Sequence, residues 1–199
     1  MEVWTRERSE VLAVVRDDMR GPLLGLEALL DALAGGALPP EVTERMHGHS
    51  RVLARRVSLL VEDLALVATP HAQSLPLTVR VLELDHQLAE CAESFPDMVI
   101  RLEGEKNLRV RGDALRIQQI CANLMRNAQR TGGRPVVIRV SGGHDSVSLR
   151  VTDAGPRDGY ELSIVKRLVE AHGGMTTHEV GGSFVFTLPR AAGAPAISA

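Results

Sequence analysis

The chain has 199 residues, of which 44% are hydrophobic and 24% charged, and its formal net charge is −2. This charge gives no electrostatic reason to expect a nucleic acid or an acidic membrane as partner, and 3% aromatic residues argue against base-stacking surfaces. No apolar run approaches the roughly 20 residues that span a bilayer, and the amino terminus is charged from Glu2 onward, unlike a signal peptide. We therefore expect a reduced, cytoplasmic chain in which Cys91 and Cys121 are buried thiols.

Residues 1–69 form the first predicted domain, a hairpin of two long amphipathic helices. Apolar residues recur at spacings of three or four, which is typical of helices with one buried face. The first seam contains Leu12, Val15, Met19, Leu23, Leu26, Leu30 and Leu33, and the second Val42, Met46, His49, Val52, Leu53, Val57, Leu60, Leu64 and Val67. The connector AGGALPPE contains glycines that end a helix and prolines that begin one. Because two helices bury little by themselves, we expect a dimeric four-helix bundle.

Residues 70–76 are predicted to be a linker, because TPHAQSLP interrupts the helical pattern with two prolines. From residue 77 to 190 the pattern changes to a mixture of helices and strands. Helices are expected over 84–95, 113–131 and 161–174, and strands within 77–84, 98–105, 107–113, 135–155 and 175–189. This mixture predicts an α/β sandwich with one sheet and helices on one face, so the fold class of the whole chain is α+β. Residues 191–199 are expected to be a flexible tail.

Two asparagines stand four residues apart in the predicted helix 113–131. Asn123 and Asn127 of NLMRN share one face of this helix, opposite an apolar face. Two side-chain amides stacked on a helix surface can coordinate a hydrated Mg²⁺ or a triphosphate. Two solvent-exposed polar residues without a ligand are the alternative.

The order and spacing of the motifs from residue 77 to 189 resemble the ATP-binding domain of sensor histidine kinases, which shares its fold with gyrase- and Hsp90-type ATPases. The similarity rests on GDALRIQQICANLMRNAQRTGG, VSLRVTDAG and LSIVKRLVEAHGG, followed by GGSFVFTLP. The resemblance implies that Asn123 and Asn127 bind Mg²⁺ and phosphates, with the metal at Asn127. It also implies that Asp153, followed by Gly155, accepts a hydrogen bond from the adenine amino group.

The first helix resembles the phosphoacceptor helix of the same family, in which His-Glu-Leu-Arg-Thr-Pro-Leu carries the reactive histidine. This chain reads DDMRGPL, so that Asp18, Arg20 and Pro22 agree with the family whereas Asp17 stands at the position of the histidine. Pro22 is expected to kink the helix. A carboxylate is a weaker nucleophile than an imidazole and repels a polyanion, so we do not expect phosphoryl transfer through Asp17.

The nucleotide site departs from the family in its lid and in its glycine-rich stretch. Only residues 156–158 separate the two motifs between which the family has a long flexible lid. The next stretch reads GYEL from Gly159, so Glu161 places bulk and negative charge where a glycine would let the backbone approach phosphates. Arg130 could still meet a phosphate, and Asp153 an adenine edge. We expect weak or no ATP binding, with ATP and Mg²⁺ as cofactors only if the site still works.

Seven histidines could replace the missing phosphoacceptor. His49 falls on the apolar seam of the second helix, where a buried polar residue that fixes the register is the simpler interpretation, and His47 lies off the seam. His172 precedes a helix-ending glycine, where it interacts favourably with the helix dipole. The remaining four are His71, His86, His144 and His178. None has a companion acid at a spacing typical of catalysis or of a metal site, and no metal site is expected.

The favoured hypothesis is a degenerate histidine-kinase-like protein, or pseudokinase, of two-component signal transduction. It would dimerise and bind the receiver domain of a response regulator, or a partner histidine kinase, and would not need to be an enzyme. The expected docking residues are Asp17, Arg20, Pro22, Arg51 and Arg55, with Arg56 beside them. For the three arginines of the second helix, a solvated basic face is the alternative. Two other functions stay open: a histidine phosphotransferase that uses His47, His49 or a histidine of a partner, and a weakly active ATP-binding sensor kinase.

Overall fold

The computed structural model describes most of the chain, namely residues 2–36, 38–68, 75–130, 135–152, 160–179 and 183–191. The chain divides into two units, Met1–Pro70 and His71–Ala199, which are taken separately below. No helix within the described ranges is both long and apolar enough to cross a membrane.

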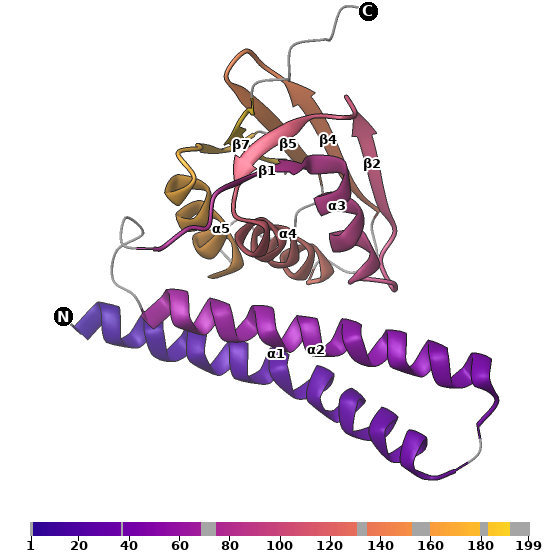
Figure 1. Cartoon of the computed structure of the whole chain (residues 1–199). Helices are drawn as coiled ribbons and strands as arrows, with labels where there is room; N and C mark the ends of the chain where they lie inside the picture. Colours follow the sequence, from indigo (N-terminus) through magenta and orange to yellow (C-terminus); the bar gives the residue numbers. More distant parts are fainter. Residues whose placement is uncertain are drawn as a thin grey trace, which may run out of the picture. The chain divides into compact units, whose positions relative to one another are not determined.

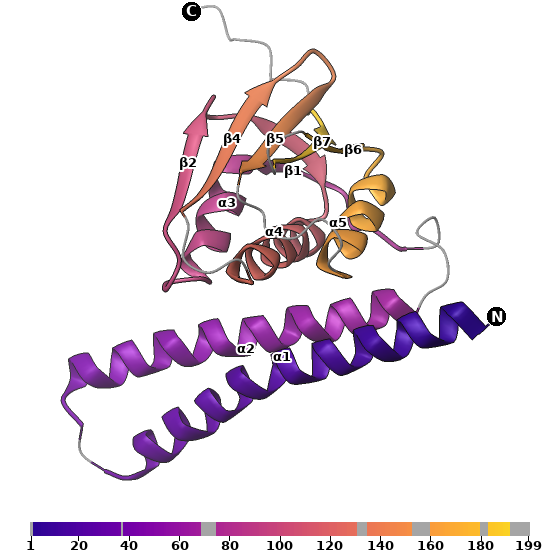
Figure 2. The ribbon, with the colours of Figure 1, turned by 180° about the vertical axis from the view of Figure 1, so that it is seen from behind.

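The first unit is a hairpin of two long helices, as the apolar periodicity predicts. Helix α1 spans Glu2–Ala34 and helix α2 spans Pro40–Ala68, and the two pack side by side (Figures 1 and 2). Helix α1 is continuous through Pro22, so the missing N–H of the proline removes one hydrogen bond without ending the helix. A kink at this position stays a prediction.

The two seams of the hairpin are only partly buried. Val15 of α1 and Leu53 and Leu60 of α2 are buried. A Cβ on Gly25 would lie 3.0 Å from the Cδ1 atom of Leu53, so this glycine allows the helices to approach closely. Other leucines of the first seam face solvent: the exposed fractions are 48% for Leu12, 43% for Leu23 and 58% for Leu30. The single hairpin therefore leaves apolar surface on α1 uncovered.

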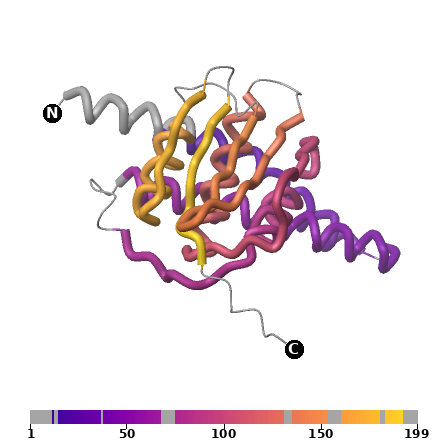
Figure 3. Tube along the Cα trace, turned by 90° about the horizontal axis from the view of Figure 1, so that it is seen from above, coloured from indigo at the N-terminus to yellow at the C-terminus, as the bar shows by residue number. Residues whose placement is uncertain are grey.

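The second unit is built on a five-stranded sheet with the strand order β2-β4-β5-β7-β6. The strands are β2 (Ile100–Gly104), β4 (Val136–Gly142), β5 (Ser146–Thr152), β6 (Thr176–His178) and β7 (Phe184–Pro189). Strand β2 pairs with β4 in parallel, and the other neighbours pair antiparallel. The strands lie next to one another in the view from above (Figure 3). The predicted sheet is thus confirmed, and it has a parallel edge.

A separate two-stranded sheet joins β1 (Arg80–Glu83) to β3 (Arg109–Gly112) in antiparallel register. Strands β2 and β3 are neighbours in the sequence, but they belong to these two different sheets. The expectation of one sheet is therefore incomplete, because the alternation of side chains indicates a strand but not its partner.

Three helices cover one face of the five-stranded sheet: α3 (Leu84–Glu93), α4 (Ala114–Gln129) and α5 (Tyr160–Ala171) (Figures 1 and 2). Alternate residues of β4, β5 and β7 point into the core: Val136, Ile138, Val140, Val147, Leu149, Val151, Phe184, Phe186 and Leu188. The helices contribute Leu88, Ile117, Ile120, Leu124, Val165 and Leu168. Cys91 and Cys121 are free thiols inside this core, as expected.

Candidate functional site

Helix α4, which carries both asparagines, is fixed at its start by Asp113. The Oδ1 atom of Asp113 accepts hydrogen bonds from the backbone N–H groups of Leu115 at 2.9 Å and Arg116 at 3.3 Å, so Asp113 is an N-cap. Its Oδ2 atom accepts a hydrogen bond from the N–H of Thr78 at 2.7 Å. One carboxylate thus joins the segment that leads into β1 to the first turn of α4.

His172, just beyond the end of α5, is hydrogen-bonded to the same N-cap residue, Asp113. Its Nδ1 atom lies 2.7 Å from the carbonyl oxygen of Leu168, and its Nε2 atom lies 3.1 Å from the backbone nitrogen of Asp113. A carbonyl only accepts and a backbone N–H only donates, so the imidazole is neutral with its proton on Nδ1. His172 is buried and holds α5 against the start of α4. Sequence reasoning assigned it to the helix dipole alone, because no local pattern shows a contact 59 residues away.

The two asparagines of α4 are buried, which corrects the expectation that they lie on the helix surface. Both side chains are 0% exposed, and the Nδ2 atom of Asn123 donates a hydrogen bond to the carbonyl of Gln119 at 2.9 Å. The reason is that α4 is covered on more than one side, since it packs against both α3 and α5. Asn123 and Asn127 therefore line the interior of the unit.

The amide oxygens of this pair fit a hard cation. Within the described part of the chain, the Oδ1 atoms of Asn123 and Asn127 are buried and accept no hydrogen bond. Both residues also take part in other polar interactions. Amide oxygens are ligands of Mg²⁺, and a buried acceptor is stabilised when an ion or a water molecule binds to it.

Arg130, the residue predicted to meet a phosphate, already forms an ion pair with Glu161, an arrangement that does not favour a polyphosphate at this position. The Nη1 atom of Arg130, at the carboxyl end of α4, lies 3.1 Å from Oε1 and 3.4 Å from Oε2 of Glu161. Glu161, in the first turn of α5, is 1% exposed. Sequence reasoning named both residues but did not pair them, because their contact depends on how α4 packs against α5.

Other residues named for nucleotide binding lie outside the described residues. These are Asp153, Gly155 and Gly159, together with the short segment 156–158 that stands in place of a lid. Their assignment rests on the sequence motifs and stays a prediction.

The phosphoacceptor position on α1 carries an exposed carboxylate. The side chain of Asp17 is 69% exposed, and its Oδ1 atom lies 3.2 Å from Nη2 of the equally exposed Arg16. Asp18 and Pro22 are half-buried, and Arg20 is exposed. The carboxylate thus stands at the surface, within reach of a partner protein.

A groove of about 520 Å³ runs beside Asp17. Its walls come from Arg16, Asp17, Met19, Arg20, Leu23, Leu24 and Glu27 of α1 and from Leu64 of α2. Arg51 and Arg55 do not line it. Asp17, Arg20 and Pro22 lie on one stretch of α1, and Arg51 and Arg55 lie two residues on either side of Leu53, the residue of α2 that packs against Gly25 of α1.

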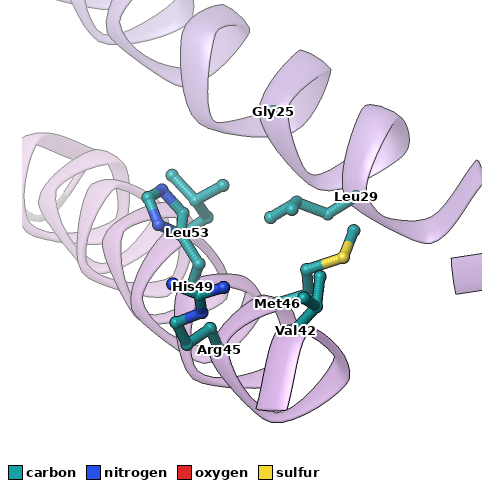
Figure 4. Close-up of a pocket in the computed structure, with 7 residues that line it drawn as sticks. All are labelled: Gly25, Leu29, Val42, Arg45, Met46, His49 and Leu53. Carbon is teal, nitrogen blue, oxygen red and sulfur yellow. The ribbon is translucent and has the colours of Figure 1, made fainter. Parts of the chain in front are cut away.

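A second groove, of about 460 Å³, lies closer to the turn of the hairpin (Figure 4). Leu29 of α1 faces Met46 and Val42 of α2 across it, and His49 and Arg45 stand on the α2 side (Figure 4). His49 is exposed in the single chain, so the interpretation that it is buried in the seam is wrong for one hairpin. His47 is also exposed, as expected for a residue off the seam.

Two of the remaining histidines have acidic neighbours on the surface. His144 Nδ1 lies 2.7 Å from Asp145 Oδ1, and His86 Nε2 lies 4.0 Å from Glu90 Oε1. The His144 pair is almost fully exposed, in the loop between β4 and β5. No group of three or more metal-ligating His, Cys, Asp or Glu side chains occurs among the residues that the structure describes.

Comparison with known proteins places these features in a family. The family of histidine kinase-, DNA gyrase B- and HSP90-like ATPases matches residues 112–192, which hold the asparagine helix and the Arg130–Glu161 pair. The signal transduction histidine-protein kinase AfsQ2 of Streptomyces coelicolor is 28% identical over 89% of this chain and 40% of its own length. The adaptive-response sensory kinase SasA of Thermosynechococcus vestitus is 27% identical over 75% of this chain and 44% of its own. The chain therefore spans less than half the length of these curated relatives.

Solved structures share the fold. The histidine kinase AdeS of Acinetobacter baumannii aligns with a TM-score of 0.53 at 23% identity, over 87% of this chain and 96% of AdeS. Full-length ShkA in complex with AMPPNP aligns with a TM-score of 0.54 at 21% identity, over 94% of this chain and 46% of ShkA. Residues 112–192 thus match the ATPase domain of the histidine kinase, DNA gyrase B and HSP90 type, and the chain is similar to histidine kinases over most of its length.

Proposed function

We propose that this chain is a degenerate histidine kinase, a pseudokinase that acts by dimerisation and protein binding instead of phosphoryl transfer. The observation that carries the proposal is Asp17, an exposed carboxylate at the phosphoacceptor position. Phosphoryl transfer needs an in-line nucleophile that can approach a polyanion. The carboxylate carries a charge of the same sign as the phosphates, so it repels the donor.

The surface around Asp17 supports a docking role. The groove beside it joins apolar side chains, among them Leu23 and Leu24, to the charged Arg20 and Glu27. Interfaces of this kind combine an apolar centre with a charged rim. Histidine kinases pair with response regulators, so the partner we propose is a receiver domain, with a partner histidine kinase as the other possibility within the same family.

A homodimer is part of this proposal, because histidine kinases dimerise as a family. The exposed leucines of α1, at positions 12, 23 and 30, supply apolar surface that a second hairpin would cover. We also propose a cytoplasmic location, in keeping with the free, buried Cys91 and Cys121.

A histidine phosphotransferase is the second candidate, and one observation favours it. His47 and His49 are both exposed on α2, so either imidazole is accessible to a phosphorylated receiver domain. A chain in which both are replaced by glutamine distinguishes the two functions. Receiver binding without phosphate exchange is expected of the pseudokinase, whereas exchange that disappears in the double variant identifies the phosphotransferase.

The proposed function is tested by labelling with [γ-³²P]ATP and Mg²⁺. We expect no covalent label on the full chain, because the nucleophile is absent and the phosphate site is blocked by an acid. Covalent label on the wild-type chain would contradict the proposal.

Receiver docking is tested separately, with purified receiver domains from the same genome and biolayer interferometry. We expect one of them to bind without ATP, and we expect Leu24→Arg to weaken this binding about tenfold or more because this leucine lines the groove. Leu102→Arg, at another exposed leucine, on β2, is the matched control and should leave binding unchanged. An equal loss of receiver affinity in both variants, or no binding by any receiver domain, would contradict the proposal that this groove is the docking surface.

A further inference from the structure

Glu161 is a buried carboxylate that the docking function does not use. It lies in the first turn of α5, is 1% exposed, and has both oxygens within 3.4 Å of the Nη1 atom of Arg130. A carboxylate in such a position is tolerated only when a counter-charge or hydrogen bonds compensate for the loss of water. The guanidinium of Arg130 supplies this compensation.

The ion pair lies next to the asparagine amides. Arg130 follows Asn127 by three residues, so the two share a face of the helix and are separated by roughly 4.5 Å along its axis. The guanidinium of Arg130 stabilises an anion, and an acidic side chain in the first turn of a helix is favoured by the helix dipole. In this chain the Glu161 carboxylate is that anion.

We propose that Glu161 is a built-in anion, which takes the position of a nucleotide phosphate on Arg130 and so excludes polyphosphate nucleotides from the ATPase domain. A phosphate that binds Arg130 comes close to the Glu161 carboxylate, and if it displaces that carboxylate it leaves a buried charge without its counter-charge. A like charge at about 4 Å in a partly buried site reduces affinity by about a hundredfold or more. The inference deepens the proposed function, on which it rests, by naming the residue that keeps the domain free of ATP.

The test measures nucleotide binding by titration calorimetry on the full chain. Its variants are Glu161→Gly, which removes charge and bulk, and Glu161→Gln, which removes the charge and keeps the shape. We expect wild type to give no saturable heat with Mg-ATP or Mg-ADP at about 1 mM, and both variants to bind each at least about tenfold more tightly than wild type. Adenosine, which lacks phosphate, should bind the variants and the wild type equally.

Two controls make the result specific. Glu170→Gln changes an exposed acid on the same helix, paired with Lys166 at 4.0 Å, and should leave nucleotide binding as in wild type. Arg130→Gln combined with Glu161→Gly should lose the gained affinity, because the arginine is the phosphate's counter-charge. Thermal unfolding of each variant shows that it is folded, and if Glu161→Gly does not fold, Glu161→Gln carries the test.

Three results overturn the inference. The first is that the Glu161 variants fold but bind Mg-ADP and Mg-ATP no more tightly than wild type, which leaves the pseudokinase proposal intact. The second is an equal gain for adenosine, which makes Glu161 a steric plug and not an anion. The third is that the wild-type chain binds Mg-ATP as tightly as the variants do. The proposed function fails as well only if the wild-type chain also becomes covalently labelled with phosphate.

Discussion

Asp113 holds together three segments of the second unit through hydrogen bonds of its carboxylate and of its backbone N–H. Its carboxylate caps α4 and accepts from Thr78, and its backbone N–H donates to His172. All of these bonds lie in a buried or half-buried setting, where an unpaired donor is costly. The start of the asparagine helix is therefore set by contacts that come from both before and after it in the sequence.

Replacing His172 tests this arrangement. His172→Ala leaves the buried N–H of Asp113 without its acceptor and removes the imidazole that packs beside Gly112. We expect the free energy of unfolding, from urea titration, to fall by about 1–3 kcal/mol. His144→Ala, at an almost fully exposed histidine, should change it by less than about 0.5 kcal/mol. Equal changes in the two variants would mean that the His172 bond contributes nothing.

The burial of Asn123 and Asn127 is the residue-scale feature that sequence reasoning missed. A spacing of four places two residues on one helix face, but it does not tell whether solvent or another element covers that face. Here α3 and α5 cover α4 on either side, so a helix with polar positions is buried almost all round. The apolar Leu124 and Met125 between the asparagines were the available signal, and two residues were too few to decide.

At the scale of elements, the hairpin helices contain glycines whose roles differ. An added Cβ would meet nothing within 4 Å at Gly48 or at Gly21, whereas at Gly25 it would meet Leu53. Gly25 thus has a packing reason in α1, and Gly48 in α2 has none in the described structure.

Gly48→Ala is therefore expected to stabilise the chain. Alanine loses less conformational freedom in a helix than glycine, which predicts a gain of about 0.5–1 kcal/mol in the free energy of unfolding. Gly21→Ala should increase the free energy of unfolding by less, because a Cβ on the residue before Pro22 crowds the proline ring in a helical backbone. Chemical denaturation with a single transition checks both, and a loss of stability in Gly48→Ala would show that this position is covered in solution.

The elements themselves were largely predictable, and their partners were not. The sequence pattern predicted helices at the positions of α1 to α5, and alternation predicted the strands of the sheet, because both patterns are local. The parallel pairing of β2 with β4 and the separate β1–β3 sheet depend on contacts between distant segments. The Arg130–Glu161 pair belongs to the same class, since 31 residues separate its members.

At the scale of the whole molecule, the exposed seam of α1 predicts self-association. Light scattering after gel filtration should give a mass near 43 kDa, twice the 21.5 kDa of one chain. Leu30→Glu puts a charge on the uncovered apolar face and should weaken the dimer about tenfold or more.

Leu102→Glu, on the exposed strand β2, is the control for this measurement and should leave the dimer intact. A wild-type chain that stays at 21.5 kDa at about 100 µM would contradict a homodimer. A partner kinase with a complementary hairpin would then be the remaining way to cover the leucines.

The parallel edge of the sheet also determines the order in which the second unit can assemble. Ile100 pairs with Val136, and β3 and α4 lie between these two residues in the sequence, so no tight turn can bring β2 and β4 together. We expect the β4–β5 hairpin, which closes across a short loop, to form early and β2 to pair with it later. Helix α4 belongs to the segment between β2 and β4, and this segment must be in place before the two strands can pair. We therefore expect the asparagine helix to reach its final position among the last steps of folding.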